Sequence, residues 1–189
     1  MAINWSNDST VNQVRPAGFK RISVVDIDSS GASTHTVTGI PSDATEVNIN
    51  FINYSQDASG SGIMRLRCGN GSIDSGGNYS WGCDDGNGNS QGSNGSSYFR
   101  CIHTSHSGGS HVLTGTIILT RATHSEGTAY SGWMIKAFFG DVNNNMTFQS
   151  TGRWHTIGVL DRFQVYNAGG HGYDSGGRMI TTVATGSAY

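Results

Sequence analysis

The sequence predicts an all-β protein, an antiparallel β-sandwich of jelly-roll type with long loops rich in Gly, Asn and Ser. Many short segments alternate apolar and polar residues, the pattern of a half-buried strand. No segment repeats apolar residues at helical spacing over two turns. The chain holds 28 Gly and 2 Pro among abundant Ser, Asn and Thr, a composition that favours strands and turns over helices. Short strands joined by Gly-rich turns are typical of sandwiches.

The first half of the chain contains five such segments. In residues 46–51, Val47, Ile49 and Phe51 share one face. In residues 63–68 two arginines, Arg65 and Arg67, alternate with apolar residues. In residues 97–103, Tyr98 and Arg100 lie opposite Phe99 and Cys101, and in residues 78–83, Tyr79, Trp81 and Cys83 share a side. Residues 19–28 change phase between Val24 and Val25, which predicts a β-bulge there.

The second half is more apolar. Residues 112–119 read as a central strand in which Gly115 marks a bulge or a close approach of two backbones. Residues 133–139 are apolar on both faces, which predicts that both are covered. Residues 162–166 and 178–183 supply further strands, and the latter would close a sheet. The segments 69–97, 105–110 and 167–177 are predicted surface loops because Gly and Asn tolerate turn conformations.

The chain length suits a single domain. With 189 residues, 35% hydrophobic and 10% aromatic, the chain can form one sizeable core. We expect residues 19–189 to form one β-sandwich domain. Residues 1–18 lack periodicity and are expected to form an N-terminal arm or attachment segment.

Charge and hydropathy exclude several partners. The net charge is −2 with 11 Lys and Arg in total, so nucleic acid, which needs clustered cations, is not an expected partner. No apolar run approaches the roughly 20 residues of a membrane span, so no membrane insertion is expected. The N-terminal residues are polar and unlike a signal peptide, which indicates synthesis in the cytoplasm.

Three cysteines, Cys68, Cys83 and Cys101, leave two interpretations open. They are buried reduced thiols, since free Cys is among the most buried residue types. Alternatively, two of them form a disulfide, or one links to a partner chain, because an odd number leaves one thiol over.

Two clusters are candidate metal ligands. Histidines His103, His106 and His111 follow Cys101, and imidazole and thiolate bind zinc or nickel where they converge. The alternatives are exposed loop histidines, or a metal on a symmetry axis supplied by several copies.

Asp84 and Asp85 are the second metal candidates. Asp85, Asn87 and Asn89 resemble the start of a calcium loop, but Ser stands where such a loop needs Gly and then Glu. Asp84 and Asp85 then serve a different calcium site or are solvated turn residues. No cofactor is predicted.

The sequence gives little support for catalysis. Residues 88–92, Gly-Asn-Ser-Gln-Gly, match a nucleophile elbow in letters, but that elbow needs an apolar strand before it and a helix after it. Neither a zinc-protease motif nor a phosphate loop is present. We expect a non-enzymatic protein.

Aromatic residues near turns are the candidate binding residues. Flat rings with a polar tip suit sugar faces or protein partners. The alternative is that these rings cover the core. The candidates are Tyr79, Trp81, Tyr98 and Tyr173, with His106 beside them.

Several segments, taken in order, resemble a Gly-rich β-domain that recurs in tail-fibre and other virion proteins of tailed bacteriophages. The long 84–97 insertion and the three cysteines depart from the pattern. The segments that carry the resemblance are Gly-Ile-Pro-Ser at 39–42, the strand 47–51 with Tyr54 and Ser55, residues 66–69 leading to Gly-Gly-Asn-Tyr at 76–79, residues 113–117, 133–135 and 160–165, and Tyr-Asp-Ser-Gly at 173–176.

The resemblance implies a virion protein made in the host cytoplasm, without catalytic residues. Its partners would be other virion proteins and a host surface glycan or protein, and it would act as a homo-oligomer such as a trimer. A tail-fibre or receptor-binding module for host attachment is the first hypothesis. Capsid decoration and a lectin-like carbohydrate-binding protein are the alternatives.

Overall fold

The computed structural model describes residues 19–26, 32–56, 63–103, 111–122, 132–143, 145–169, 172–173 and 176–185. Within these residues the chain forms thirteen strands in two sheets and no helix, and every strand pair is antiparallel. The prediction of an all-β antiparallel sandwich is therefore confirmed. The predicted arm, residues 1–18, lies outside the described residues, as does His106.

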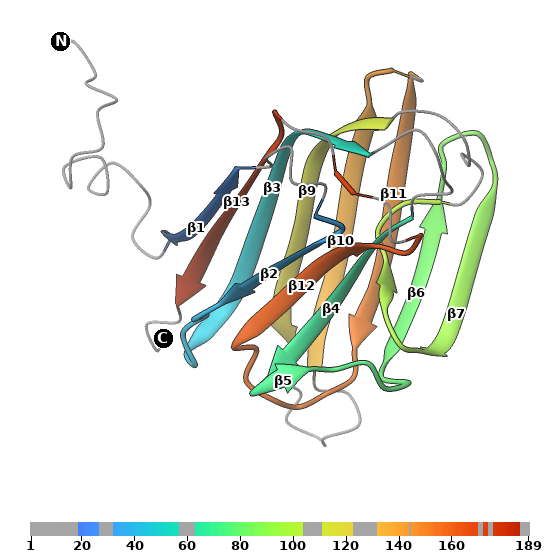
Figure 1. Ribbon diagram of the computed structural model, residues 1–189. Coiled ribbons are helices and arrows are strands. Elements are labelled where there is room, and N and C mark those ends of the chain that lie inside the picture. The colour runs from blue at the N-terminus through green and yellow to red at the C-terminus, as the bar shows by residue number, and fades with distance from the viewer. Residues whose placement is uncertain are drawn as a thin grey trace, which may run out of the picture.

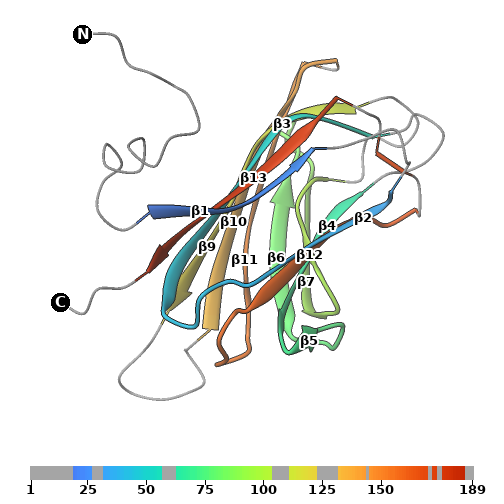
Figure 2. The ribbon, with the colours of Figure 1, turned by 60° about the vertical axis from the view of Figure 1, so that its left-hand side comes forward.

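The larger sheet has eight strands, and the smaller sheet lies across one of its faces (Figure 1). Figure 2 gives the same two layers from a direction turned by 60°. In spatial order the larger sheet contains β1 (Phe19–Asp26), β13 (Arg178–Thr185), β3 (Ala44–Gln56), β9 (His111–Ala122), β10 (Gly132–Asp141), β11 (Met146–Trp154), β6 (Tyr79–Asp84) and β7 (Ser90–Ser96). The smaller contains β2 (Thr34–Thr38), β12 (Arg162–Asn167), β4 (Met64–Asn70) and β5 (Ser72–Ile73), with β8 (Phe99–Arg100) also paired to β4.

The strand pairing is that of a jelly roll. When the short β5 and the hairpins β6–β7 and β10–β11 are set aside, eight strands remain in chain order. The first pairs with the last, β1 with β13, and the nesting continues inward through β2 with β12, β3 with β9 and β4 with β8. This nesting of two Greek keys defines the jelly roll. The two hairpins are insertions that widen the larger sheet beyond β9.

The core lies between the sheets and follows the alternation of the sequence. Val47, Ile49 and Phe51 are buried as predicted. Trp133 and its alternate neighbours on β10 are also buried, but Met134 and Phe138 on the other face are exposed at 42% and 41%. The prediction that both faces of this strand are covered is therefore wrong. Met134 and Phe138 point away from the smaller sheet, which packs on the opposite face.

Two predicted irregularities are present in altered form. In β1 the register shifts between Arg21 and Ser23, earlier than the predicted position. At Gly115 two backbones approach closely, because a Cβ there would lie 2.0 Å from the carbonyl oxygen of Phe138 on β10. The register shift near Gly115 belongs to the neighbouring strand, between Phe51 and Tyr54 of β3.

In the part of the chain that the structure describes, no helix has the length and hydrophobicity to cross a membrane.

Candidate functional site

A cluster of arginines and aromatic rings lies where β4, β8, β12 and β6 meet. We call it the arginine–aromatic face. Its members are Arg65, Arg67, Trp81, Tyr98, Arg100 and Tyr166.

The alternation of β4 positions the first two arginines. Met64, Leu66 and Cys68 are completely buried, so the residues between them, Arg65 and Arg67, project from the other side of the smaller sheet. The same alternation, at Phe99 on β8 and at Val165 on β12, places Tyr98, Arg100 and Tyr166 opposite the core residues, where Tyr98 and Tyr166 are half-buried and Arg100 is buried beside Trp81. The β4 register places Arg65 opposite Tyr166 on one side and opposite Arg100 on the other.

Guanidinium groups and rings are stacked on this face. The Arg65 guanidinium carbon lies 3.8 Å from the centre of the Tyr98 ring. Tyr98 is stacked on Trp81, with ring centres 6.3 Å apart and an interplanar angle of 23°. The Arg100 guanidinium carbon lies 4.7 Å from the Trp81 ring centre. The order Arg65, Tyr98, Trp81, Arg100 thus places a cation on each side of an aromatic pair, a favourable cation–π arrangement.

Arg67 forms a second stack beside the first. Its guanidinium carbon lies 4.6 Å from the centre of the Tyr166 ring, and its Nε donates a hydrogen bond to the carbonyl oxygen of Ser97 at 3.1 Å. Burial raises the pKa of Tyr166 above its ordinary value, so its hydroxyl, whose oxygen is buried, stays neutral at physiological pH.

Within the described residues, the arginines of this face form no ion pair with a carboxylate. In the described residues, the ion pairs are those of Arg162 with Asp161, Arg178 with Asp26, and His103 with Asp85. Arg100 donates a hydrogen bond from Nη1 to the neutral amide oxygen of Gln91. The Nε atoms of Arg65 and Arg100 are buried and make no hydrogen bond within the described part of the chain.

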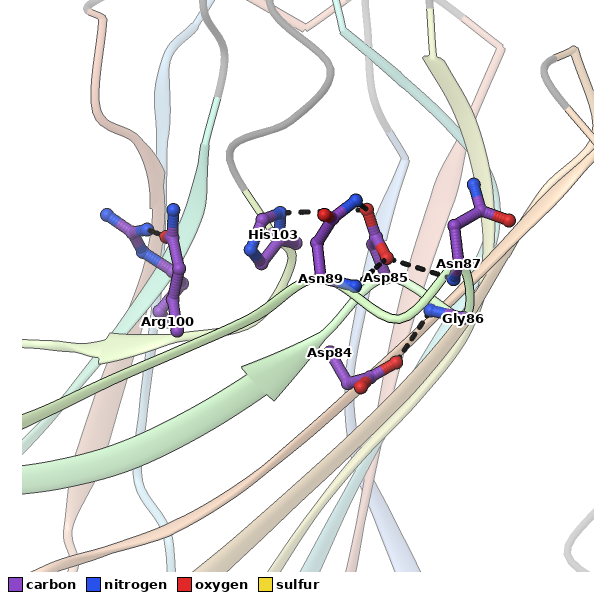
Figure 3. A network of polar contacts seen from close by, with 8 residues as sticks. Asp84, Asp85, Gly86, Asn87, Asn89, Arg100 and His103 are labelled. Atoms are coloured by element: carbon purple, nitrogen blue, oxygen red, sulfur yellow. Dashed lines mark hydrogen bonds and ion pairs between the residues drawn. The ribbon is translucent and has the colours of Figure 1, made fainter.

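The turn between β6 and β7 lies next to this face and holds the two aspartates predicted as metal ligands (Figure 3). The Asp85 side chain is 1% exposed. Its Oδ1 accepts hydrogen bonds from the backbone amides of Asn87 and Asn89 at 2.9 and 3.1 Å, and its Oδ2 accepts one from the Asn89 side-chain amide at 2.8 Å. Asp84 is exposed and accepts a hydrogen bond from the Gly86 amide at 2.7 Å. Asp85 therefore organises its own turn.

His103 lies against this turn. Its ring is buried and points toward Asp85 and Asn89 (Figure 3), with its Nδ1 3.9 Å from Oδ2 of Asp85. Of the other metal candidates, His106 and the side chain of His111 lie outside the described residues. Among the residues that are described, no three His, Cys, Asp or Glu side chains converge to hold a metal ion.

Two of the predicted binding residues are core residues. Tyr79 and Tyr173 are 0% and 2% exposed, so the expectation that their rings face a ligand is wrong. Tyr79 joins the two sheets: its hydroxyl accepts a hydrogen bond from the Cys68 amide at 2.8 Å and lies 3.0 Å from the carbonyl oxygen of Asp74, to which it donates. Tyr173 packs on Tyr54, with ring centres 4.3 Å apart.

The other two predicted aromatic residues come together. Trp81 is 8% exposed and lies beneath Tyr98, which is half-buried. Tyr98 is thus the ring that the face presents to solvent, and Trp81 supports it from below.

The three cysteines are free and buried. Burial raises the pKa of all three thiols, that of Cys83 to about 11. Thiols of this kind are unreactive because the thiolate is the nucleophile.

The Gly-Asn-Ser-Gln-Gly segment, residues 88–92, matches a nucleophile elbow only in its letters. It spans the β6–β7 turn and the start of β7. Ser90 is the first residue of β7 and pairs with Asp84. The turn thus joins two strands, whereas a nucleophile elbow joins a strand to a helix.

Apart from the arginine–aromatic face, a shallow groove lies on the larger sheet, along β6, β7 and β11. Its volume is about 530 Å³, and Gly82, Gly92 and Gly152 form much of its floor, with Ser80, Asn94 and Thr151 beside them. These groups offer hydrogen bonds but no charge.

Comparisons with known proteins are sparse. No protein-family model matches the chain, and no curated protein sequence matches it. A solved structure described as the CBM2 module of Lactobacillus casei BL23 phage J-1 evolved Dit is similar at a TM-score of 0.27 and 6% identity, over 82% of this chain and 70% of that chain. A TM-score of this size indicates neither a common fold nor a common ligand.

Arg65, Arg67, Arg100 and Tyr166 were not among the predicted site residues. The alternation of the sequence does place both β4 arginines and Arg100 opposite the core residues. The sequence pattern does not show that β4 pairs with β8 and β12, nor in which register these strands pair.

Proposed function

We propose that this chain is a non-enzymatic attachment module of a tailed-phage particle, which binds a saccharide on the surface of the host cell. It would act as a homo-oligomer fixed to another virion protein. One observation carries the proposal: solvent-facing Tyr98 is stacked on Trp81 between two guanidinium groups, on the outer surface of a sandwich.

The chemistry of this face suits a sugar. Both faces of the Tyr98 ring are covered, one by Trp81 and the other by the Arg65 guanidinium, so the ring offers a sugar its edge and its hydroxyl. Amide and guanidinium groups donate hydrogen bonds to sugar hydroxyls. Jelly rolls occur in viral capsid and lectin domains. The resemblance of residues 39–183 to tail-fibre β-domains supports a place in the virion.

The test is binding of the purified full-length chain to surface polysaccharide prepared from the host. Tyr98→Ala should weaken binding at least about tenfold, since a hot-spot aromatic contributes about 2 kcal/mol or more. Phe138→Ala is the matched control, because it removes an exposed ring from the opposite sheet and should leave affinity unchanged. Equal affinity of the Tyr98→Ala chain and the original chain, with both folded, would refute the proposal. So would release of reducing sugar ends by the chain.

A second candidate function is capsid decoration. The exposed Met134 and Phe138 on β10 favour it, because exposed apolar side chains on a sheet are typical of protein contacts. A copy number per particle close to that of the capsid protein, together with loss of incorporation for Phe138→Ala, would support this role over host attachment.

A further inference from the structure

We infer that the saccharide bound at the arginine–aromatic face is acidic, carrying carboxylate groups as uronic acids do. This inference rests on the proposed function and adds the charge of the ligand and the residues that bind its charged groups. Arg65 and Arg67 are the residues assigned to the carboxylates.

The first argument is the placement of charge. The β4–β8 register puts Arg65 directly opposite Arg100, and like charges at opposed positions destabilise a sheet. Arg67 adds a third positive charge two residues along the same strand. No carboxylate in the described residues lies within ion-pair distance of these three arginines, although the chain as a whole has a net charge of −2. A cluster of like charges that destabilises the free protein is expected at a binding site, because the ligand there supplies the opposite charge.

The second argument is the orientation of the guanidinium groups. Arg65 is held over the Tyr98 ring and Arg67 over the Tyr166 ring. Stacking occupies the flat face of a guanidinium and leaves its N–H edges, which match a carboxylate with two parallel hydrogen bonds. In Arg65 the Nε is buried, so the edge that we assign to a carboxylate is that of the two terminal Nη groups. The Arg67 Nε is already bonded to the Ser97 carbonyl, which fixes the side chain and leaves the terminal Nη groups for a ligand.

The third argument separates a saccharide from an acidic protein. Rings and guanidinium groups alternate on this face, and neutral hydrogen-bonding residues continue it across the smaller sheet. On that sheet Gln164 pairs with Thr36 through a side-chain hydrogen bond at 3.4 Å. A protein interface is also enriched in Tyr, Trp and Arg, so the feature that favours a saccharide is the neutral, hydrogen-bonding surface that continues from this face. This pattern fits a chain of hydroxyl-rich, carboxylated rings.

The experiment uses the full-length chain and a matched pair of probes. Oligogalacturonate carries one carboxylate per sugar, and the same oligomer fully methyl-esterified carries none. Binding is measured by calorimetry and by Trp fluorescence at low and physiological salt. The variants are Arg65→Gln and Arg67→Gln, and the control is Arg121→Gln, which removes the same charge from an exposed position on β9 of the larger sheet.

We expect oligogalacturonate to bind at least about tenfold more tightly than its methyl ester, since hydrogen bonds from a guanidinium to an ionised carboxylate are stronger than those to a neutral ester. Each of Arg65→Gln and Arg67→Gln should remove that preference, and Arg121→Gln should keep it. Arg67→Lys should recover only part of the affinity, because an ammonium group cannot bind a carboxylate through two parallel bonds.

Other results overturn the inference. Equal binding of the acidic and esterified oligomers would mean that the face binds neutral sugars, so that the proposed function stands and its charge assignment fails. Equal loss for Arg121→Gln would mean diffuse attraction without a site. Tighter binding to polyglutamate than to oligogalacturonate would assign the face to an acidic protein. Binding of no saccharide of either kind, including host polysaccharide, would refute the proposed function itself.

Discussion

Replacing Tyr79 with Phe removes one oxygen atom that joins the two sheets. The ring is fully buried on β6, and its hydroxyl accepts a hydrogen bond from the backbone amide of Cys68 on β4. The same hydroxyl donates its proton to the carbonyl oxygen of Asp74 at 3.0 Å. Because burial raises the pKa of Tyr79 well above its ordinary value, these bonds persist over the whole pH range in which the protein is folded.

The expected loss of stability follows from the hydrogen-bonding groups that Tyr79→Phe leaves without a partner. The Cys68 amide becomes a buried donor without a partner, which costs about 1–3 kcal/mol, and one further hydrogen bond of about 1 kcal/mol is lost. Cys68 is completely buried, so water cannot replace the hydroxyl without opening the core. Tyr79→Phe should therefore lower the free energy of unfolding by about 2–4 kcal/mol. For a chain of this length that corresponds to a fall of about 4–16 °C in Tm.

Urea unfolding followed by Trp fluorescence measures this cost. The matched control is Tyr98→Phe, which removes the same atom from a half-buried ring whose hydroxyl makes no hydrogen bond among the described residues, and which should change stability by less than about 0.5 kcal/mol. Tyr79→Phe should leave saccharide affinity unchanged. A stability loss below about 0.5 kcal/mol for Tyr79→Phe, or a loss of affinity at full stability, would refute the assignment of this residue to the core.

Three further predictions concern the fold. Gly115→Ala should destabilise the protein by about 3 kcal/mol because overpacking would force two backbones apart. The control is Gly140→Ala, one residue pair along the same two strands, where the added Cβ meets only an ordinary contact at 3.9 Å and should be tolerated. Equal unfolding midpoints of the two variants would contradict this prediction. The three thiols should resist iodoacetamide at pH 8 until urea unfolds the chain, since burial raises their pKa; mass spectrometry showing labelled native protein would disprove it. Asp74→Asn should cost about 1 kcal/mol at pH 6 and less at pH 3, as followed by urea unfolding at both pH values; an equal cost at both would contradict it.

The sign of the Asp74 effect follows from its contacts. Partial burial alone would raise the pKa of Asp74, but hydrogen bonds from Trp154, Gly76 and Asn78 lower it below the ordinary value of 3.8. A carboxyl group with a lowered folded-state pKa stabilises the protein above its unfolded pKa. This contribution is lost as the pH falls through the folded-state value, so wild type and variant should converge in acid.

The sequence predicts which side chains of a strand share a face but not which strands are neighbours. Alternation correctly assigned Arg65 and Arg67 to the face opposite Met64, Leu66 and Cys68. It contains no information on the register between β4 and β8, which are separated in the chain by the whole β6–β7 hairpin. Because the stack of Arg65 on Tyr98 depends on that register, the site could not be predicted from local pattern alone.

The errors at Tyr79 and Tyr173 have a physical cause. Both residues lie near turns, but a position near a turn does not imply that the side chain is exposed. The alternation of Tyr79, Trp81 and Cys83 indicates instead that all three share the buried side, and the structure places them there. The same alternation, extended by two residues, predicts that Asp85 is also buried, and the structure agrees. Strand phase is therefore a better guide to exposure here than distance from a Gly-rich loop.

The arginine–aromatic face is a consequence of the inserted hairpins. A jelly roll with matched sheets would bury every inward side chain of the larger sheet under a strand of the smaller one. Here β10–β11 and β6–β7 extend the larger sheet beyond β9, so that β6 packs against β8 near the rim of the sandwich and β7 is the edge strand (Figure 1). The inward Trp81 is consequently covered by the side chains of Tyr98 and Arg100. A large ring under side chains at the rim of a sandwich remains close to solvent, so the extension that enlarges the sheet also creates the face to which we assign the proposed saccharide.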